Sequence, residues 1–235
     1  MKADNRAESI SPILKRNTMD RISNFRLEPF IDIAENRIIG FEVLSSLKAG
    51  VAPESWFYEQ KPEDLIRILK FQLESISALG LKEPCFFNLT IAGILALSDD
   101  DILCISRYRK TGIEISDAHN IKLLSDDERA FFFNHIDYLR ESGVCVWVDD
   151  FYFDELIHLN YYRQHVDGVK MDRSEVRTPW LRKEISLIRH VLGDIDILVE
   201  GVETDSDLTA VRKAGARLAQ GYFWNVDNLS VDVTG

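Results

Sequence analysis

Two adjacent carboxylates, Asp149 and Asp150, follow an apolar run and raise the question of a metal ion. The run is Val144-Cys145-Val146-Trp147-Val148, which is typical of a strand buried on both faces. Neighbouring carboxylates at the end of such a strand repel each other and resist burial unless a cation or strong hydrogen-bond donors lie between them. Hard divalent cations take oxygen ligands of this type. The pair therefore predicts a metal site.

Further polar residues stand at the ends of other predicted strands, where a barrel of parallel strands carries its chemistry. They are Glu42, Asn88, Glu114, Lys170, Glu200 and Gln220. A cluster of five carboxylates with one lysine cannot stay ionised without cations, so two divalent metal ions are the natural inference. Two metals with a bridging water would suit phosphodiester hydrolysis.

Each of these residues also has an ordinary structural explanation. Glu42 and Glu114 would each fit an exposed strand position, and Lys170 would fit an ion pair with Asp172. Taken singly, such residues are weak indicators of a site. Their placement at successive strand ends is what favours a shared site.

Short apolar runs alternate with longer amphipathic ones from residue 25 onwards. Strands are predicted over residues 25–33, 37–44, 85–89, 111–115, 144–149, 168–171, 196–200 and 217–221, with a turn at Glu35-Asn36. Helices are predicted over residues 64–79, 91–97, 99–107, from a capping box at Ser125 to 142, near 154–162, from Thr178-Pro179 to 192, and over 205–214 after Thr204. This alternation fits a parallel α/β sheet or a closed (β/α)₈ barrel, and the first strand–turn–strand unit suggests one antiparallel strand.

Length and composition bound the class of protein. The 235 residues suffice for one large α/β domain, which we place at 24–235 behind a polar tail at 1–23. A net charge of −11 argues against binding to nucleic-acid polymers or membrane surfaces, but metal ions would still allow a small anionic ligand. Cys85, Cys104 and Cys145 are predicted to be core thiols of a reduced cytoplasmic protein. No apolar run approaches the length of a membrane span, so no membrane insertion is expected.

The ordered motifs resemble the EAL-domain phosphodiesterases of cyclic di-GMP over about residues 25–229. The matching segments are Glu28-Pro29-Phe30, Glu42-Val43-Leu44, Asn88-Leu89-Thr90, Glu114-Ile115-Ser116-Asp117, Asp149-Asp150-Phe151, Lys170-Met171-Asp172, Glu200-Gly201-Val202-Glu203-Thr204 and Gln220-Gly221-Tyr222. The resemblance implies a modified (β/α)₈ TIM-like barrel with one antiparallel strand. It also implies two Mg²⁺ or Mn²⁺ ions per site and hydrolysis of cyclic di-GMP to linear pGpG.

The resemblance also implies a role for each matching residue. Metal ligands would be Glu42, Asn88, Glu114, Asp149 and Asp150. Lys170 would orient the attacking water or stabilise developing charge, and Glu200 would act as general base or as a ligand through water. Asp172, Gln220, Glu203 and Asp117 would support the ligands or the substrate. A homodimer is expected on the same ground.

Departures from the family pattern support a different hypothesis. Ser46 stands where the family carries a phosphate-contacting arginine, and Tyr152-Phe153-Asp154-Glu155 replaces a glycine-rich loop. The family's proline after Gln-Gly-Tyr is also missing, with Asn225-Val226-Asp227 in that region. The alternative to an active enzyme is therefore a degenerate module that binds cyclic di-GMP or a protein partner without turnover.

Overall fold

The strands of the chain close into a barrel, with one further strand outside it. The computed structural model describes residues 18–224 and 229–232. The strand order is β2-β3-β4-β5-β6-β7-β8-β1-β9, and an additional β1–β2 pairing closes the ring. The strands are β1 (Ile22–Asp32), β2 (Arg37–Leu47), β3 (Cys85–Leu89), β4 (Thr111–Ile115), β5 (Cys145–Phe151), β6 (Gly168–Met171), β7 (Asp196–Val199), β8 (Leu218–Ala219) and β9 (Leu229–Asp232). The predicted modified (β/α)₈ barrel is confirmed.

Strand β1 is the predicted antiparallel strand, since it runs opposite to both of its barrel neighbours, β2 and β8. The turn between β1 and β2 contains Asn36 with a φ of 49°, a left-handed angle that asparagine tolerates. The hairpin is longer than predicted, because β1 begins at Ile22 and β2 extends to Leu47. All strand pairs from β2 to β8 are parallel. The carboxyl ends of these strands therefore meet at one mouth of the barrel.

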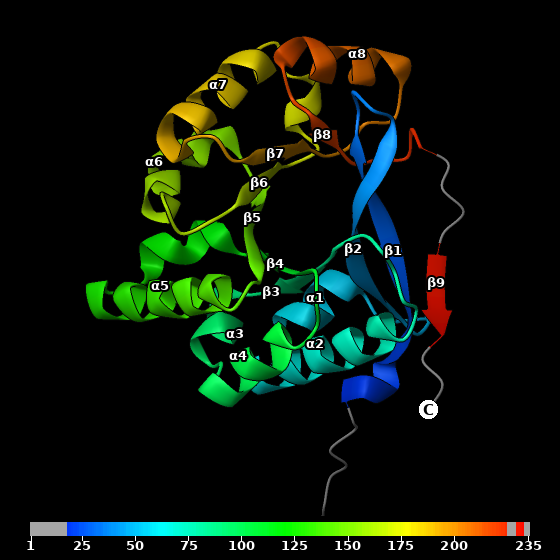
Figure 1. Cartoon of the computed structure of the whole chain (residues 1–235), viewed down its shortest axis with the longest axis vertical. Helices are drawn as coiled ribbons and strands as arrows, with labels where there is room; N and C mark the ends of the chain where they lie inside the picture. The colour runs from blue at the N-terminus through cyan, green and yellow to red at the C-terminus, as the bar shows by residue number, and fades with distance from the viewer. Residues whose placement is uncertain (1–17, 225–228, 233–235) are drawn as a thin grey trace, which may run out of the picture.

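Helices surround most of the barrel, and the β1–β2 hairpin and β9 form its right-hand side in Figure 1. They are α1 (Pro53–Tyr58), α2 (Pro62–Ser77), α3 (Ile91–Leu95), α4 (Asp99–Ser106), α5 (Asp126–Glu141), α6 (Leu156–Leu159), α7 (Leu181–Leu192) and α8 (Asp205–Ala214). The short 3₁₀ helices are η1 (Thr18–Arg21), η2 (Ala118–Leu123), η3 (Phe153–Glu155), η4 (Asn160–Tyr162) and η5 (Glu175–Arg177). The predicted capping box at Ser125 begins α5, and Thr204, which was predicted only to cap α8, also forms a capping box.

Three local predictions, for α7, for the segment 154–162 and for Cys145, are wrong, and one strand was not predicted. Helix α7 begins at Leu181, and the Thr178 hydroxyl donates to the buried carboxylate of Glu184 instead of capping the helix. The helix expected over residues 154–162 is divided into η3, α6 and η4. Strand β9 was not predicted, because it exists by antiparallel pairing with β1, from which it is separated by nearly the whole chain. The core-thiol prediction holds for Cys85 but not for Cys145, which is exposed at the first position of β5.

Some predictions fall outside the described residues, namely residues 1–17 of the tail and the segment 225–227. Within the described part of the chain, none of the helices combines the length and the apolar character that crossing a membrane requires.

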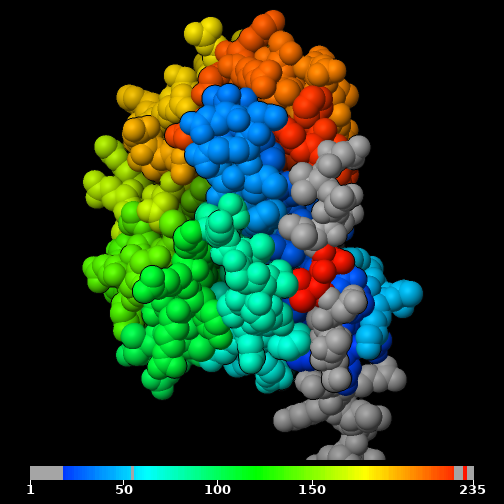
Figure 2. Space-filling view, turned by 45° about the vertical axis from the view of Figure 1, so that its right-hand side comes forward, coloured from blue at the N-terminus to red at the C-terminus, as the bar shows by residue number. Residues whose placement is uncertain are grey.

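The turn end of the hairpin is fixed to the last α/β unit. In Figure 2 the blue hairpin lies against the orange residues of α8 and the segment after it. Asp32 is completely buried there, and its carboxylate accepts hydrogen bonds from Arg217 and from the backbone N–H groups of Ala34 and Glu35. Arg212 donates to the carbonyl oxygen of Ile33. These contacts hold β1 against β8 and so help to close the barrel.

A layer of large side chains fills the barrel interior beneath the mouth. It consists of Phe30, Phe86, Trp147, Leu198 and Leu218, which form a buried cluster separate from the outer core. The Trp147 ring lies 4.8 Å from the Phe86 ring and 5.6 Å from the Phe30 ring, measured between centroids. Glycine makes room for this layer, since a Cβ at Gly168 would lie 2.4 Å from Trp147 Cε2. The barrel therefore has a solid aromatic floor, and side chains above it stay at the mouth.

We expect Gly168→Ala to destabilise the protein by about 1–3 kcal/mol, because the new methyl group overpacks the floor against the Trp147 indole. Urea denaturation would measure the free energy of unfolding. Trp147→Leu is the matched background, since it removes the ring atoms Cε2, Cδ2 and Nε1 that the methyl group would meet. In that background, Gly168→Ala should lower the free energy of unfolding by clearly less than it does in the wild type. Equal losses in both backgrounds would contradict the contact between the methyl group and the Trp147 ring.

Candidate metal centre at the barrel mouth

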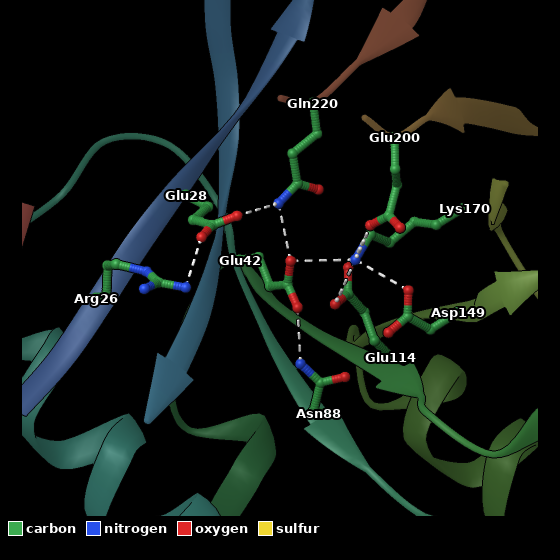
Figure 3. Close-up of polar contacts among 9 residues, drawn as sticks. All are labelled: Arg26, Glu28, Glu42, Asn88, Glu114, Asp149, Lys170, Glu200 and Gln220. Atoms are coloured by element: carbon green, nitrogen blue, oxygen red, sulfur yellow. Dashed lines mark hydrogen bonds and ion pairs between the residues drawn. The ribbon is translucent and has the colours of Figure 1, made fainter. Parts of the chain in front are cut away.

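The ammonium group of Lys170 lies at the centre of the mouth among four carboxylates (Figure 3). Lys170 Nζ is 2.8 Å from Glu200, 2.9 Å from Asp149, 3.1 Å from Glu42 and 3.3 Å from Glu114. The lysine side chain is only 1% exposed. Burial lowers the pKa of Lys170, but the surrounding carboxylates outweigh burial and hold that pKa well above its usual value. Lys170 is therefore a buried, charged group. The predicted alternative of a simple pair with Asp172 is not observed among the described ion pairs.

The side chains of the site come from different strands, and each lies two positions after a residue of the barrel floor on its own strand. Successive side chains of a strand point to opposite faces, so the residue two positions after a floor residue also points into the barrel. The pairs of floor and mouth positions are Phe86 and Asn88, Gly112 and Glu114, Trp147 and Asp149, Gly168 and Lys170, Leu198 and Glu200, and Leu218 and Gln220. The barrel thereby brings the predicted strand-end residues together.

Asp149 and Asp150 both reach the mouth because strand β5 is irregular at this point. Its pairing with β6 shifts register between Val148 and Phe151, and Asp150 has a φ of 48°. In a regular strand the two neighbouring carboxylates would point to opposite faces. Aspartate accepts the left-handed conformation more readily than most residues, which allows the irregularity without a glycine.

The amide side chains of Gln220 and Asn88 hold Glu42. Gln220 Nε2 donates to Glu42 Oε2 at 2.8 Å and to Glu28 Oε2 at 3.2 Å. Asn88 Nδ2 donates to Glu42 Oε1 at 2.9 Å. Burial alone would raise the pKa of Glu42, but Lys170 and these two donors lower it below its usual value. Glu42 is therefore the carboxylate of the cluster that is held ionised.

The other carboxylates retain protons more strongly. Burial raises the pKa of Glu114 well above its usual value, and neighbouring carboxylates add to the effect against the opposing charge of Lys170. Burial and the charge of Asp149 raise the pKa of Asp150 to about 7. Burial also raises the pKa of Glu200 to about 8, with Lys170 opposing and Asp149 contributing. The single positive charge of Lys170 is therefore not enough to balance the negative charge of the carboxylates.

The arrangement of oxygen atoms fits two divalent cations. Glu42, Glu114 and Asp149 offer oxygen atoms within 4.8 Å of one another, and so do Asp149, Asp150 and Glu200. Asp149 belongs to both groups, as a carboxylate between two neighbouring ions would. Among the described residues, Glu114 Oε1 is buried without a hydrogen-bond partner. Hard cations such as Mg²⁺ and Mn²⁺ take such oxygen ligands, and a cation would satisfy this atom.

The structure places the remaining predicted residues around the cluster or away from it. Asp172 is buried, and its carboxylate accepts from the backbone N–H of Ser174, which fixes the loop after β6. Asp117 accepts from the backbone N–H of Ile91 at 2.6 Å and so fixes the start of α3, just after Asn88. Glu203 is half exposed and forms an ion pair with Arg177, outside the cluster.

One residue at the mouth was missed by sequence reasoning. Arg26 forms an ion pair with Glu28, with 2.7 Å between Arg26 Nη2 and Glu28 Oε1 (Figure 3). It lies two residues before Glu28 on the same face of β1. Applying the alternation of strand residues backwards from Glu28 would have found it.

We expect the metal-free protein to lose stability as the pH rises towards about 8. The pKa of Glu200 is about 8 in the folded protein against a usual value of 4.5, so between these values the folded state binds more protons than the unfolded state. The free energy of unfolding therefore falls with rising pH, by roughly 1–3 kcal/mol between about pH 6 and about pH 8. Urea denaturation in the presence of a chelator would measure it.

Glu200→Gln is the matched control, because an amide does not titrate and should make the curve flatter. Mn²⁺ should restore stability at the higher pH, since a bound cation replaces the lost protons. A flat wild-type curve in chelator would contradict the proton retention described for Glu200.

A known family model matches the part of the chain that contains most of the residues at the mouth. The family model of the EAL domain matches residues 106–225, which is just over half of the chain and includes Glu114, Asp149, Lys170, Glu200 and Gln220. Glu42 and Asn88 precede the matched range, and the closure of the barrel brings them to the same mouth.

Solved structures share the fold at low sequence identity. A manganese and cyclic di-GMP complex of BlrP1 from Klebsiella pneumoniae superposes with a TM-score of 0.71 at 20% identity, covering 90% of this chain and 59% of that protein. The PaMucR phosphodiesterase in complex with c-di-GMP superposes with a TM-score of 0.69 at 19% identity, covering 88% of this chain and 96% of that protein. An EAL domain protein from Listeria monocytogenes EGD-e superposes with a TM-score of 0.68 at 22% identity, covering 88% of this chain and 89% of that protein. This chain thus spans less than two thirds of the length of BlrP1. On the extent of the family match, the chain belongs to the EAL-domain family.

Proposed function

We propose that this protein hydrolyses cyclic di-GMP to linear pGpG with two divalent metal ions, and so lowers the level of this second messenger. The observation that carries the proposal is that two clusters of three acidic residues have Asp149 in common. Both clusters lie beside the buried ammonium of Lys170. Two metals bridged by a carboxylate suit the displacement of an oxygen at phosphorus. The complexes of BlrP1 and PaMucR with cyclic di-GMP support the choice of substrate.

The proposed ligands of the two ions are Glu42, Asn88, Glu114, Asp149 and Asp150. Bound Mg²⁺ or Mn²⁺ would supply charge compensation for the phosphate and a lower pKa for the attacking water. Gln220 holds Glu42 in place through its 2.8 Å hydrogen bond, while Asp117 and Asp172 fix the loops that follow β3 and β6. BlrP1 was also solved with manganese, which supports a divalent metal of this kind.

Lys170 and Glu200 are the proposed catalytic residues. Lys170 presents a fixed positive charge to the phosphate as negative charge develops on it. Glu200, 2.8 Å from Lys170, accepts the proton of the attacking water. Burial raises the pKa of Glu200 to about 8 in the absence of metal ions. Bound cations would lower this pKa and so leave the carboxylate ionised and able to accept a proton. The water oxygen bonds to phosphorus, the bond from phosphorus to the 3′ oxygen breaks, and the proton ends on the released 3′ hydroxyl.

We expect Asp149→Asn to reduce kcat/KM for cyclic di-GMP by at least about a hundredfold, because it weakens both proposed metal positions at once. Formation of pGpG in the presence of Mg²⁺ or Mn²⁺ would be measured by chromatography. Glu63→Gln, an exposed change in the first turn of α2, is the control and should leave turnover unchanged. Absence of pGpG from the wild-type protein with either metal would refute catalysis.

A non-catalytic role is the second candidate, and the segment after β5 favours it. This segment contains no glycine from Tyr152 to Leu159. It is also held in place, since the Phe153 backbone N–H donates to Glu175 and Glu155 pairs with Lys122. A segment held in this way would not rearrange over a substrate as a glycine-rich loop can.

Calorimetry distinguishes the two candidates. A non-catalytic module would bind intact cyclic di-GMP without forming pGpG, whereas an enzyme would consume it in the cell of the calorimeter. Failure to bind would leave a protein partner as the remaining candidate. The homodimer and the cytoplasmic location expected from the sequence stay predictions.

A further inference from the structure

Arg26 is an inward-facing cation at the mouth, placed one layer above the carboxylate cluster. It pairs with Leu44 across the hairpin, and Glu28 pairs with Glu42 two positions deeper. Because strand residues alternate, Arg26 shares the inward face with Glu28. The described strands contain three basic residues, Arg26, Arg37 and Lys170, and Arg37 lies at the turn end of the hairpin, away from the mouth.

The ion pair of Arg26 holds Nη2, and the exposed part of the side chain remains accessible to a ligand. Its Nη2 pairs with Glu28 at 2.7 Å, and Glu28 in turn accepts from Gln220, which holds Glu42. The guanidinium is therefore connected to the metal centre through one carboxylate and one amide (Figure 3). Arg26 Nε is buried without a partner, while the side chain as a whole is 41% exposed. Within residues 18–224 and 229–232, Glu28 is the one carboxylate at ion-pair distance from Arg26.

A cyclic dinucleotide brings two phosphodiester groups to this acidic mouth. The metal centre can engage the phosphate that is cleaved, but the second phosphate would still face a surface dominated by carboxylates. Lys170 would not serve it, since its ammonium lies within the carboxylate cluster, where the cleaved phosphate would bind. A guanidinium presents several donors in a plane and suits a phosphate better than an ammonium does.

We propose that Arg26 binds the phosphate of cyclic di-GMP that is not cleaved, with Glu28 holding the guanidinium in the required orientation. This inference rests on the proposed function and adds a substrate-binding residue to it. A competing explanation is that Arg26 only neutralises Glu28, so that substrate is not repelled. The two explanations differ in what happens when both charges are removed.

The test compares Arg26→Ala, Arg26→Lys, Glu28→Gln and the double variant Arg26→Ala/Glu28→Gln. A phosphate contact predicts that Arg26→Ala raises the KM for cyclic di-GMP about ten- to hundredfold and changes kcat by less than about threefold. Arg26→Lys should fall between it and the wild type, because lysine keeps the charge but loses the planar donors. The double variant should stay as weak as Arg26→Ala.

Recovery of the wild-type KM in the double variant would overturn the proposal in favour of simple neutralisation of Glu28. An unchanged KM in Arg26→Ala would overturn it as well, while turnover by the wild type would leave the proposed function standing. If the wild type binds cyclic di-GMP without turnover, the Kd from calorimetry replaces the KM and the same comparisons decide. If the wild type neither binds nor hydrolyses it, the proposed function and this inference fail together.

Arg37→Ala is the matched control for these variants. Arg37 is also an exposed arginine of the hairpin and is also paired with a glutamate, Glu35, but it lies at the other end of β2. It should leave the KM unchanged. Thermal unfolding of every variant checks that a change in KM does not come from a loss of folded protein.

Discussion

The mouth of this barrel depends on one buried ammonium ion. Lys170 lies within 3.3 Å of four carboxylates that come from four different strands or strand ends. Without that charge the carboxylates would repel one another and could be buried only as neutral acids. The ammonium therefore allows the ligand set to exist before a metal binds. It does not neutralise the set, and the remaining negative charge would favour the binding of further cations.

Steric constraints below the mouth support this electrostatic arrangement. The aromatic floor of Phe30, Phe86 and Trp147 occupies the space into which long side chains such as Lys170 could otherwise bend. The Lys170 ammonium lies 5.7 Å from the centroid of the Phe30 ring, over its face. Glycines at 112 and 168 make this filling possible, because any larger residue there would meet an aromatic ring. The packing of the floor thus limits where the Lys170 ammonium can lie. A change in the floor would therefore alter the position of this charge at the site.

An acidic protein that is to bind an anion needs cations at the place of binding. The net charge of −11 and the carboxylates of the mouth would repel a dinucleotide at long range. Bound metal ions would reverse the local charge at the cluster, and Arg26 places a positive group above it. Its pairing with Glu28 connects this group to Gln220 and Glu42. Ligand binding at the rim and metal binding in the centre would therefore act on one hydrogen-bonded network.

Local sequence patterns were enough to predict most of the strands and helices and the polar residues at the strand ends. Strands at residues 85–89, 111–115 and 168–171 were predicted to the residue, because the apolar run that makes a buried strand is a local pattern. The polar residue at each strand end follows from the same pattern. Four features could not be read from local patterns. Lys170 pairs with four distant carboxylates rather than with Asp172, and Asp150 turns into the mouth. Arg26 lies above Glu42, and β9 pairs with β1. These features depend on how the barrel closes and on the register between strands far apart in the chain, which no local pattern encodes.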